Sequence, residues 1–263
     1  MSDNITVSSA DGEILIALAP NSKRGAQEYM RLLRAQLPEK FPLLSFYFQP
    51  GDMMNQILNL GLPTPIDVRV SGLANENILF GFAKKLEEQM LKIPGAVDVH
   101  IQQRRDQPVL QIEVDRERAA QMNFTQRDVA ENVLIQASSS FMVTPNFWTD
   151  PKSGHTYNIV VQTPLNKLQT IDDLVNTPLP SHGAAQTQYL GNVAKVVRGQ
   201  TAAQVSHTNV LNTFNIRANV QGRDTGSVST EIKALIKEMS KELPKGVSIE
   251  LGGQASTMDT AFS

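Results

Sequence analysis

The side chains that most often carry chemistry are few in this chain, and they are scattered along it. The four histidines are His100, His155, His182 and His207, and their spacings match no metal-ligand pattern. The chain contains no cysteine, so it offers no disulfide, thiolate nucleophile or cysteine metal site, and it suits reducing and oxidising compartments equally. We therefore expect a protein that has no specific metal site and needs no cofactor.

Catalytic and nucleic-acid-binding motifs are also missing from the sequence. It has no H-E-x-x-H, P-loop or G-x-S-x-G motif. The adjacent carboxylates Asp172 and Asp173 follow Thr170, which is more typical of negative charge at a helix N-terminus than of a general-acid pair. The formal charge of −2 comes without a basic cluster, which argues against nucleic acid as a partner. We expect a protein that is not an enzyme.

The elements that would position any binding residue repeat along the chain as a strand–helix–strand pattern. In each copy the helix is expected to end at a Leu-Pro or Ile-Pro step, because proline disfavours helical dihedrals in the residue before it. The three copies are Gly12–Phe48, Pro65–Gln102 and Thr213–Gly253, with the proline stops at Pro38, Pro94 and Pro244.

The second and third copies are expected to combine into one four-stranded sheet with both helices on one face. In the third copy Val228, Ile232 and Met239 recur at the helical period and form the apolar face. Gly95 and Gly246 permit the tight turn into the returning strand. The first copy has no such partner, so half of its domain is expected to be missing or to come from another chain.

The segment between the second and third copies predicts a separate module. The polar run His100–Gln107 between two strands predicts a hairpin, and the pattern changes after Asp115. Helices are expected at Arg116–Met122 and Gln126–Ala137, the second with a capping box that starts at Thr125. Strands are expected at His155–Gln162 and Thr187–Arg198. An inserted α+β domain follows from this arrangement.

A binding surface is predicted near the end of the first copy. Phe46, Phe48 and Met53 belong to a group of aromatic and methionine side chains, which adaptable binding surfaces use for ligands of varied shape. The alternative interpretation of Pro50–Pro65 is an apolar linker. The chain has 263 residues, 41% of them hydrophobic, which suits one large or two small domains. It contains neither 18 consecutive apolar residues nor a signal peptide, so we expect a soluble chain.

Several motifs in order carry a resemblance to a known family. The most specific is E-V-D-R-E-x-A-x-x-x-x-x-T-x-x-D-V at Glu113–Val129. It is accompanied by QILNLGLPTPIDVRVSG (Gln56–Gly72), FWTDPKSGHTYNIVVQTP (Phe147–Pro164) and LGNVAKVVRG (Leu190–Gly199). From Glu13 to Gly253 the chain resembles the second large periplasmic loop of resistance–nodulation–division (RND) transporters, the AcrB-like multidrug efflux pumps.

This resemblance implies an α+β fold of ferredoxin-like split βαβ porter subdomains with an inserted α+β docking subdomain. It assigns residues 1–64 to the second half of a first porter subdomain, and 65–114 and 207–253 to the two halves of a second one. Residues 115–206 become the docking subdomain, and 254–263 lead toward the inner membrane of the parent protein.

The function that the resemblance implies is part of the periplasmic headpiece of a proton-driven efflux transporter. The parent protein would be a homotrimer that meets a periplasmic adaptor protein and an outer-membrane channel, and its substrates would be hydrophobic or amphiphilic small molecules. Because the proton relay of the family lies in transmembrane helices, which this chain lacks, the chain alone could not pump.

The resemblance also assigns binding residues. Phe46 and Phe48 match aromatics that line the substrate-access pocket, and His100 and Gln102 match polar residues that face it. Asn59 stands where multidrug members carry an acidic residue, which changes the expected range of substrates. The alternative function is a free-standing ferredoxin-like module that binds ligands or proteins without a role in transport.

Overall fold

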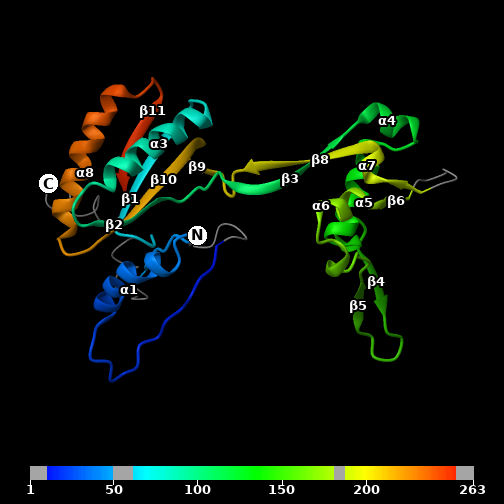
Figure 1. The fold of residues 1–263 in the computed structure, drawn as a ribbon, viewed down its shortest axis with the longest axis horizontal. Coiled ribbons are helices and arrows are strands. Elements are labelled where there is room, and N and C mark those ends of the chain that lie inside the picture. Colours follow the sequence, from blue (N-terminus) through cyan, green and yellow to red (C-terminus); the bar gives the residue numbers. More distant parts are fainter. Residues whose placement is uncertain (1–10, 50–61, 181–186, 253–263) are drawn as a thin grey trace. The chain divides into compact units, whose positions relative to one another are not determined.

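The structure, a computed structural model, describes residues 11–49, 62–180 and 187–252 (Figure 1). The chain divides into two compact units. Unit 1 consists of Met1–Gln107 and Thr201–Ser263, and unit 2 consists of Pro108–Gln200. Unit 2 is therefore an insertion in the sequence of unit 1.

Unit 1 contains a sheet with the strand order β11–β1–β10–β2. A short strand, β9, pairs with Leu211, Asn212 and Thr213 at the start of β10, before the residues that pair with β2. All of these neighbours are antiparallel. The strands are β1 (Ile66–Gly72), β2 (Ala96–Ile101), β9 (Ser206–Thr208), β10 (Leu211–Val220) and β11 (Val247–Gly252).

Two helices make the crossovers of this sheet. Helix α3 (Glu76–Met90) joins β1 to β2, with β10 between these two strands. Helix α8 (Thr225–Met239), followed by the 3₁₀ turn η3 (Ser240–Glu242), joins β10 to β11, with β1 between them. Both crossovers thus skip one strand, which confirms the predicted ferredoxin-like split βαβ arrangement and the pairing of the second copy with the third.

The core of unit 1 lies between one face of the sheet and both helices. Alternate residues of β1 and β10 point into it, because successive side chains of a strand face opposite sides. Leu79 and Leu86 of α3 and Val228 and Ile232 of α8 are fully buried in the same cluster as these strand residues. The strand members of the cluster are Ile66, Val68, Val70, Val99, Phe214, Ile216 and Ala218.

Two glycines make the turns that follow the crossover helices. Gly95 has φ of +91° and Gly246 has φ of +84°, a region that residues with a Cβ rarely adopt. The expected tight turns are therefore present. Helices α3 and α8 both end before their prolines, Pro94 and Pro244, as predicted.

The first copy of the repeat differs from the prediction. Its helix α1 (Ala26–Lys40) includes Pro38 in its last turn instead of ending before it, because a proline there removes only one N–H donor from the helix. The expected strands on either side of α1 are not strands in residues 11–49. A strand forms only where a neighbouring strand can bond its N–H and C=O groups. Residues 11–49 form no strand, and Ile14 and Leu15 of the predicted strand are 84% and 87% exposed.

The predicted hairpin after β2 is also wrong. Strand β2 pairs with β10, whereas β3 (Gln107–Val114) pairs with β8 (Ala194–Thr201). The polar run between β2 and β3 therefore connects two different sheets. At this junction the amide of Ala203 donates a 2.9 Å hydrogen bond to the carbonyl of Arg104.

Unit 2 has its own small core of buried residues, among them Phe124, Val129 and Leu190. Its capping box at Thr125, with Asp128, is present as predicted, and a second one joins Thr170 to Asp173. The predicted strand at 187–198 is interrupted by a helical turn. The elements within unit 2 are α4 (Arg116–Gln121), α5 (Gln126–Ala137), η1 (Ser140–Met142), β4 (Asn146–Thr149), β5 (Thr156–Ile159), η2 (Leu165–Lys167), α6 (Ile171–Val175), β6 (Pro178–Leu179), β7 (Gln188–Tyr189) and α7 (Leu190–Val193).

Candidate functional site

The candidate site lies on the side of the unit 1 sheet that faces away from α3 and α8. We call this side the polar face, because the strand residues that alternate with the core residues are polar. It consists of Asp67, Arg69, Asp98, His100, Gln102, Thr213, Asn215, Arg217 and Asn219.

Hydrogen bonds connect the side chains in the middle of the polar face, and several of them end on Asp67. Asn215 donates to both carboxylate oxygens of Asp67, at 2.9 and 3.1 Å, and Arg69 donates to the same carboxylate at 2.9 Å. Gln103 donates to the side chain of Asn215 and accepts a bond from its backbone amide. Because the side chain of Asp67 is fully buried, these partners are what make a carboxylate tolerable there.

The segment after α1 covers the β2 end of the polar face. The ring of Tyr47 stacks on the imidazole of His100 with 3.8 Å between the ring centroids. The backbone amide of Phe48 donates to Asp98 at 3.3 Å, and the carbonyl of Phe48 accepts from Asn219 at 2.6 Å. The structure thus brings the first copy of the repeat into contact with the second and third.

Most of the residues predicted for the site can be placed. Phe48 and His100 both contact Asp98: the amide of Phe48 bonds its carboxylate, and the imidazole of His100 bonds its backbone carbonyl. Gln102 is buried, and its side chain hydrogen-bonds His100. Phe46 is half-buried and packs against Phe41, with the ring centroids 6.3 Å apart. The other two predicted residues, Met53 and Asn59, lie outside the described residues.

Three residues of this cluster were missed by reasoning from the sequence, whereas Tyr47 belongs to the same aromatic and methionine group as Phe46 and Phe48. Nothing in the sequence pointed to Arg34, Asp98 and Asn219, because their proximity depends on how β2, β10 and α1 come together. Asp98 has φ of +55° at a bulge where the register between β2 and β10 shifts, and a bulge can redirect a side chain in this way.

The electrostatics of the cluster favour a neutral imidazole. Burial lowers the pKa of His100 below its ordinary value of 6.5, and the facing guanidinium of Arg217 lowers it further. The bond from Nδ1 of His100 to the carbonyl of Asp98 acts in the opposite direction but is the smaller effect. Partial burial also raises the pKa of the Tyr47 phenol.

A pH dependence of stability follows from the lowered pKa of His100. Since the unfolded chain binds the proton more tightly, the stability that a neutral His100 contributes is fully present above about pH 6.5 and is lost as the pH falls toward the folded-state pKa. Urea denaturation from about pH 7 to about pH 5 should therefore show a smaller loss of stability in His100→Gln than in the parent chain. The matched control is the exposed His155→Gln. Parallel pH profiles for the parent and His100→Gln would contradict the prediction.

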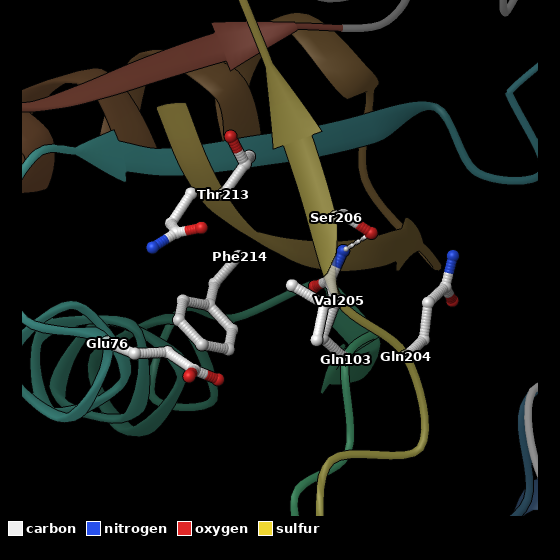
Figure 2. A pocket seen from close by; sticks show the side chains of 8 residues that line it. Glu76, Gln103, Gln204, Val205, Ser206, Thr213 and Phe214 are labelled. Atoms are coloured by element: carbon white, nitrogen blue, oxygen red, sulfur yellow. Dashed lines mark hydrogen bonds between the residues drawn. The ribbon is translucent and has the colours of Figure 1, made fainter. Parts of the chain in front are cut away.

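Two hollows among the described residues differ in size. One lies between β9, β10 and the start of α3, where Phe214 and Glu76 face Gln103, which hydrogen-bonds Ser206 (Figure 2). Its volume of about 10 Å³ is the space of a single water molecule. A second hollow, of about 240 Å³, lies in unit 2 and is lined by Phe124, Asp128 and Pro180 among others. Neither hollow contains a residue predicted for the site.

Two further observations concern metals and membranes. Within residues 11–49, 62–180 and 187–252, no three histidine, aspartate or glutamate side chains are close enough together to hold a metal ion. None of the helices in the same ranges has the length and apolar character needed to cross a bilayer.

The sequence matches the model of the AcrB/AcrD/AcrF family over residues 2–263. The chain belongs to this family. The RND resemblance of the motifs is thereby confirmed, and the split βαβ sheet with an inserted unit is the fold in which those motifs occur.

The similar proteins are much longer than this chain. It is 28% identical over 267 residues to the cation efflux system protein CzcA of Alcaligenes sp. (strain CT14), covering 99% of this chain and 24% of the relative. It is 28% identical over 217 residues to the nickel and cobalt resistance protein CnrA of Cupriavidus metallidurans, covering 81% and 20%. The crystal structure of a heavy metal efflux pump superimposes with a TM-score of 0.70 at 24% identity, covering 92% of this chain and 24% of the pump, which establishes the fold.

Proposed function

We propose that the chain forms part of the periplasmic headpiece of a proton-driven RND efflux transporter in the bacterial inner membrane. The observation that carries this proposal is the family match over essentially the whole chain. In this role it carries substrates rather than transforming them, in keeping with the lack of a catalytic motif in the sequence. Its relatives named above are efflux or resistance proteins.

The two units support a division of labour within this role. Residues 65–114 and 207–253 would be a porter subdomain, because they contain the split βαβ sheet. Residues 1–64 would be part of another, since the exposed apolar side chains at Ile14 and Leu15 suit a neighbouring strand supplied from elsewhere in the transporter. Residues 254–263 would lead toward the membrane.

Residues 115–206 would be the docking subdomain. The hairpin β4–β5 exposes large aromatic and apolar side chains on both faces, which suits contact with other proteins more than with water. These side chains are Phe147, Trp148, Tyr157 and Ile159. The partners in this proposal are other copies of the transporter in a homotrimer, a periplasmic adaptor protein and an outer-membrane channel.

For the substrate, the cluster of Phe46, Tyr47, Phe48, His100 and Gln102 favours hydrophobic or amphiphilic small molecules. Aromatic rings beside a few polar groups are what such ligands need. Metal cations are the second candidate, and the printed names of the relatives favour them. We rank the amphiphilic substrates first because the aromatic rings lie beside His100, whereas the described residues bring no three histidine, aspartate or glutamate side chains together.

The test uses the intact transporter that contains this chain. Replacing both Phe46 and Phe48 by alanine should lower the efflux of large apolar dyes roughly tenfold, because burying an aromatic ring stabilises a bound ligand by about 1.5–3 kcal/mol. The readouts are dye efflux from cells and tolerance to nickel and cobalt, at equal expression. The control is Ile78→Ala, an exposed apolar side chain on α3.

The outcomes separate the alternatives. Unchanged efflux of every large dye would show that the two phenylalanines are ordinary packing residues. Reduced metal tolerance with unchanged dye efflux would support the cation candidate. If the full-length protein that contains this chain conferred neither dye efflux nor metal tolerance, a binding module without a role in transport would be the better interpretation.

A further inference from the structure

Helix α1 and the segment after it lie against the polar face with little apolar burial. Among the apolar residues of α1 only Met30 is buried, whereas α3 buries Leu79, Ala83, Leu86 and Met90. The hydrophobic effect scales with the apolar area removed from water, so it anchors α1 much less firmly than α3. Polar contacts must therefore hold α1 in place.

Those polar contacts converge on one carboxylate, that of Asp98. Arg34 of α1 donates two parallel bonds to it, from Nε at 2.9 Å and from Nη2 at 2.6 Å, and a third from Nη1 to Gln221 at 2.6 Å. The side chains of Arg34 and Asp98 are only 15% and 4% exposed. Bidentate pairing fixes the geometry of the two side chains, and removing one partner of a buried pair costs several kcal/mol because it leaves an uncompensated charge.

The same carboxylate also holds the segment that follows α1. Asn219 donates to Asp98 at 2.8 Å and to the carbonyl of Phe48 at 2.6 Å, and the amide of Phe48 donates to Asp98. The guanidinium of Arg34 lies 5.0 Å from the centroid of the Phe48 ring, within the range of a cation–π contact. Breaking the pair of Arg34 and Asp98 would thus loosen both α1 and the segment that carries Tyr47 over His100.

We propose that Arg34 and Asp98 form a latch that controls access to the polar face. When the pair is formed, Tyr47 and Phe48 cover His100 and the neighbouring edge of β2. When it is broken, the cover lifts while the core of unit 1 keeps its structure, because neither latch residue belongs to the cluster between the sheet and the helices. The latch deepens the proposed function, since it regulates access to the same candidate site.

The chain has no cysteine, so one introduced thiol can report on the cover. We would replace His100, which lies beneath Tyr47, by cysteine and measure the rate of maleimide labelling under native conditions. Arg34→Ala and Asp98→Asn should each raise this rate at least about tenfold, since unpairing one member of a buried pair costs more free energy than a factor of ten requires. Asparagine suits position 98 because it tolerates the positive φ found there.

Three controls make the result specific. The double variant of Arg34→Ala and Asp98→Asn should label no faster than the faster single variant, because residues of one latch are not additive. Arg24→Ala removes an exposed ion pair to Glu28 in the same helix region and should leave the rate unchanged. A second reporter, Ala83→Cys in the buried face of α3, should stay unreactive in every background.

Each outcome bears on the proposal. A rate at position 100 that stays low in both Arg34→Ala and Asp98→Asn would overturn it, because the cover would then be held by other contacts. Equal increases at positions 100 and 83 in both variants would also overturn it, because the pair would then maintain the whole unit. The labelling rate is measured without transport. A negative labelling result would therefore not contradict the proposed efflux function, and a negative transport result would not contradict the proposal that Arg34 and Asp98 form a latch.

Discussion

Replacing Leu86 by alanine should lower the free energy of unfolding of unit 1 by about 2–5 kcal/mol. Leu86 is fully buried in α3, in the cluster between both helices and the sheet. The truncated side chain would lose its transfer free energy and leave a cavity that the rigid sheet can fill only in part. A loss of this size is a large fraction of the stability of an ordinary domain.

The measurement is urea denaturation followed by far-ultraviolet circular dichroism, which reports on the helices of both units, so the shift of the transition between the parent chain and the variant is compared. The matched control is Leu91→Ala, five residues further along at the C-cap of α3, where the residue is 59% exposed. Exposed substitutions usually change stability by less than about 0.5 kcal/mol. Equal effects of the two substitutions would mean that α3 does not pack on the sheet as described.

The second large effect is expected at Gly72, at the end of β1. An added Cβ there would lie 2.5 Å from the carbonyl oxygen of Gly246 and 2.9 Å from the Cα of Val247. Both are backbone atoms of the paired segment before and within β11, so they cannot rotate away as a side chain could. Gly72→Ala should therefore destabilise unit 1 by about 1–3 kcal/mol, as overpacking does elsewhere.

Gly81 provides the control for this substitution. It lies in α3, and nothing comes within 4 Å of a Cβ placed on it. Gly81→Ala should stabilise unit 1 by about 0.5–1 kcal/mol, because alanine is the better helix former. The two glycine substitutions should thus shift the urea midpoint in opposite directions. A shift in the same direction would show that the close approach of β1 and β11 is not present in solution.

Much of unit 1 could be predicted from sequence because local pattern and long-range pairing agree there. The apolar periodicity of α8, the glycines at positions 95 and 246 and the prolines at 94 and 244 all mark the same split βαβ unit. The capping box at Thr125 in unit 2 was also predictable, because it depends on residues only three positions apart. At Thr170 the sequence predicted negative charge at a helix N-terminus, and the structure has a second capping box there.

The remaining features depend on neighbours that are distant in sequence. The apolar run near Ile14 has the pattern of a strand, but no strand of residues 11–49 forms there because pattern alone supplies no hydrogen-bond partner. The hairpin expected after β2 failed because β10, far along the chain, takes the adjacent place in the sheet. Asp98 could not be selected for the site, since its position follows from a bulge that exists only once β2 and β10 are paired.

The hydrogen bond between Arg104 and Ala203 has a consequence for how fast the protein folds. Ile101 of β2 and Ile216 of β10 are partners in the sheet, although residues 102 to 215 separate them. Closing a loop of that length in an unstructured chain costs entropy that grows with the logarithm of its length, and such distant contacts slow folding. If unit 2 folds first, the pairing of β3 with β8 brings residues 104 and 203 together and leaves only a short loop for β10 to close. Folding of the inserted unit would then speed the pairing of β2, which precedes it in the sequence, with β10, which follows it.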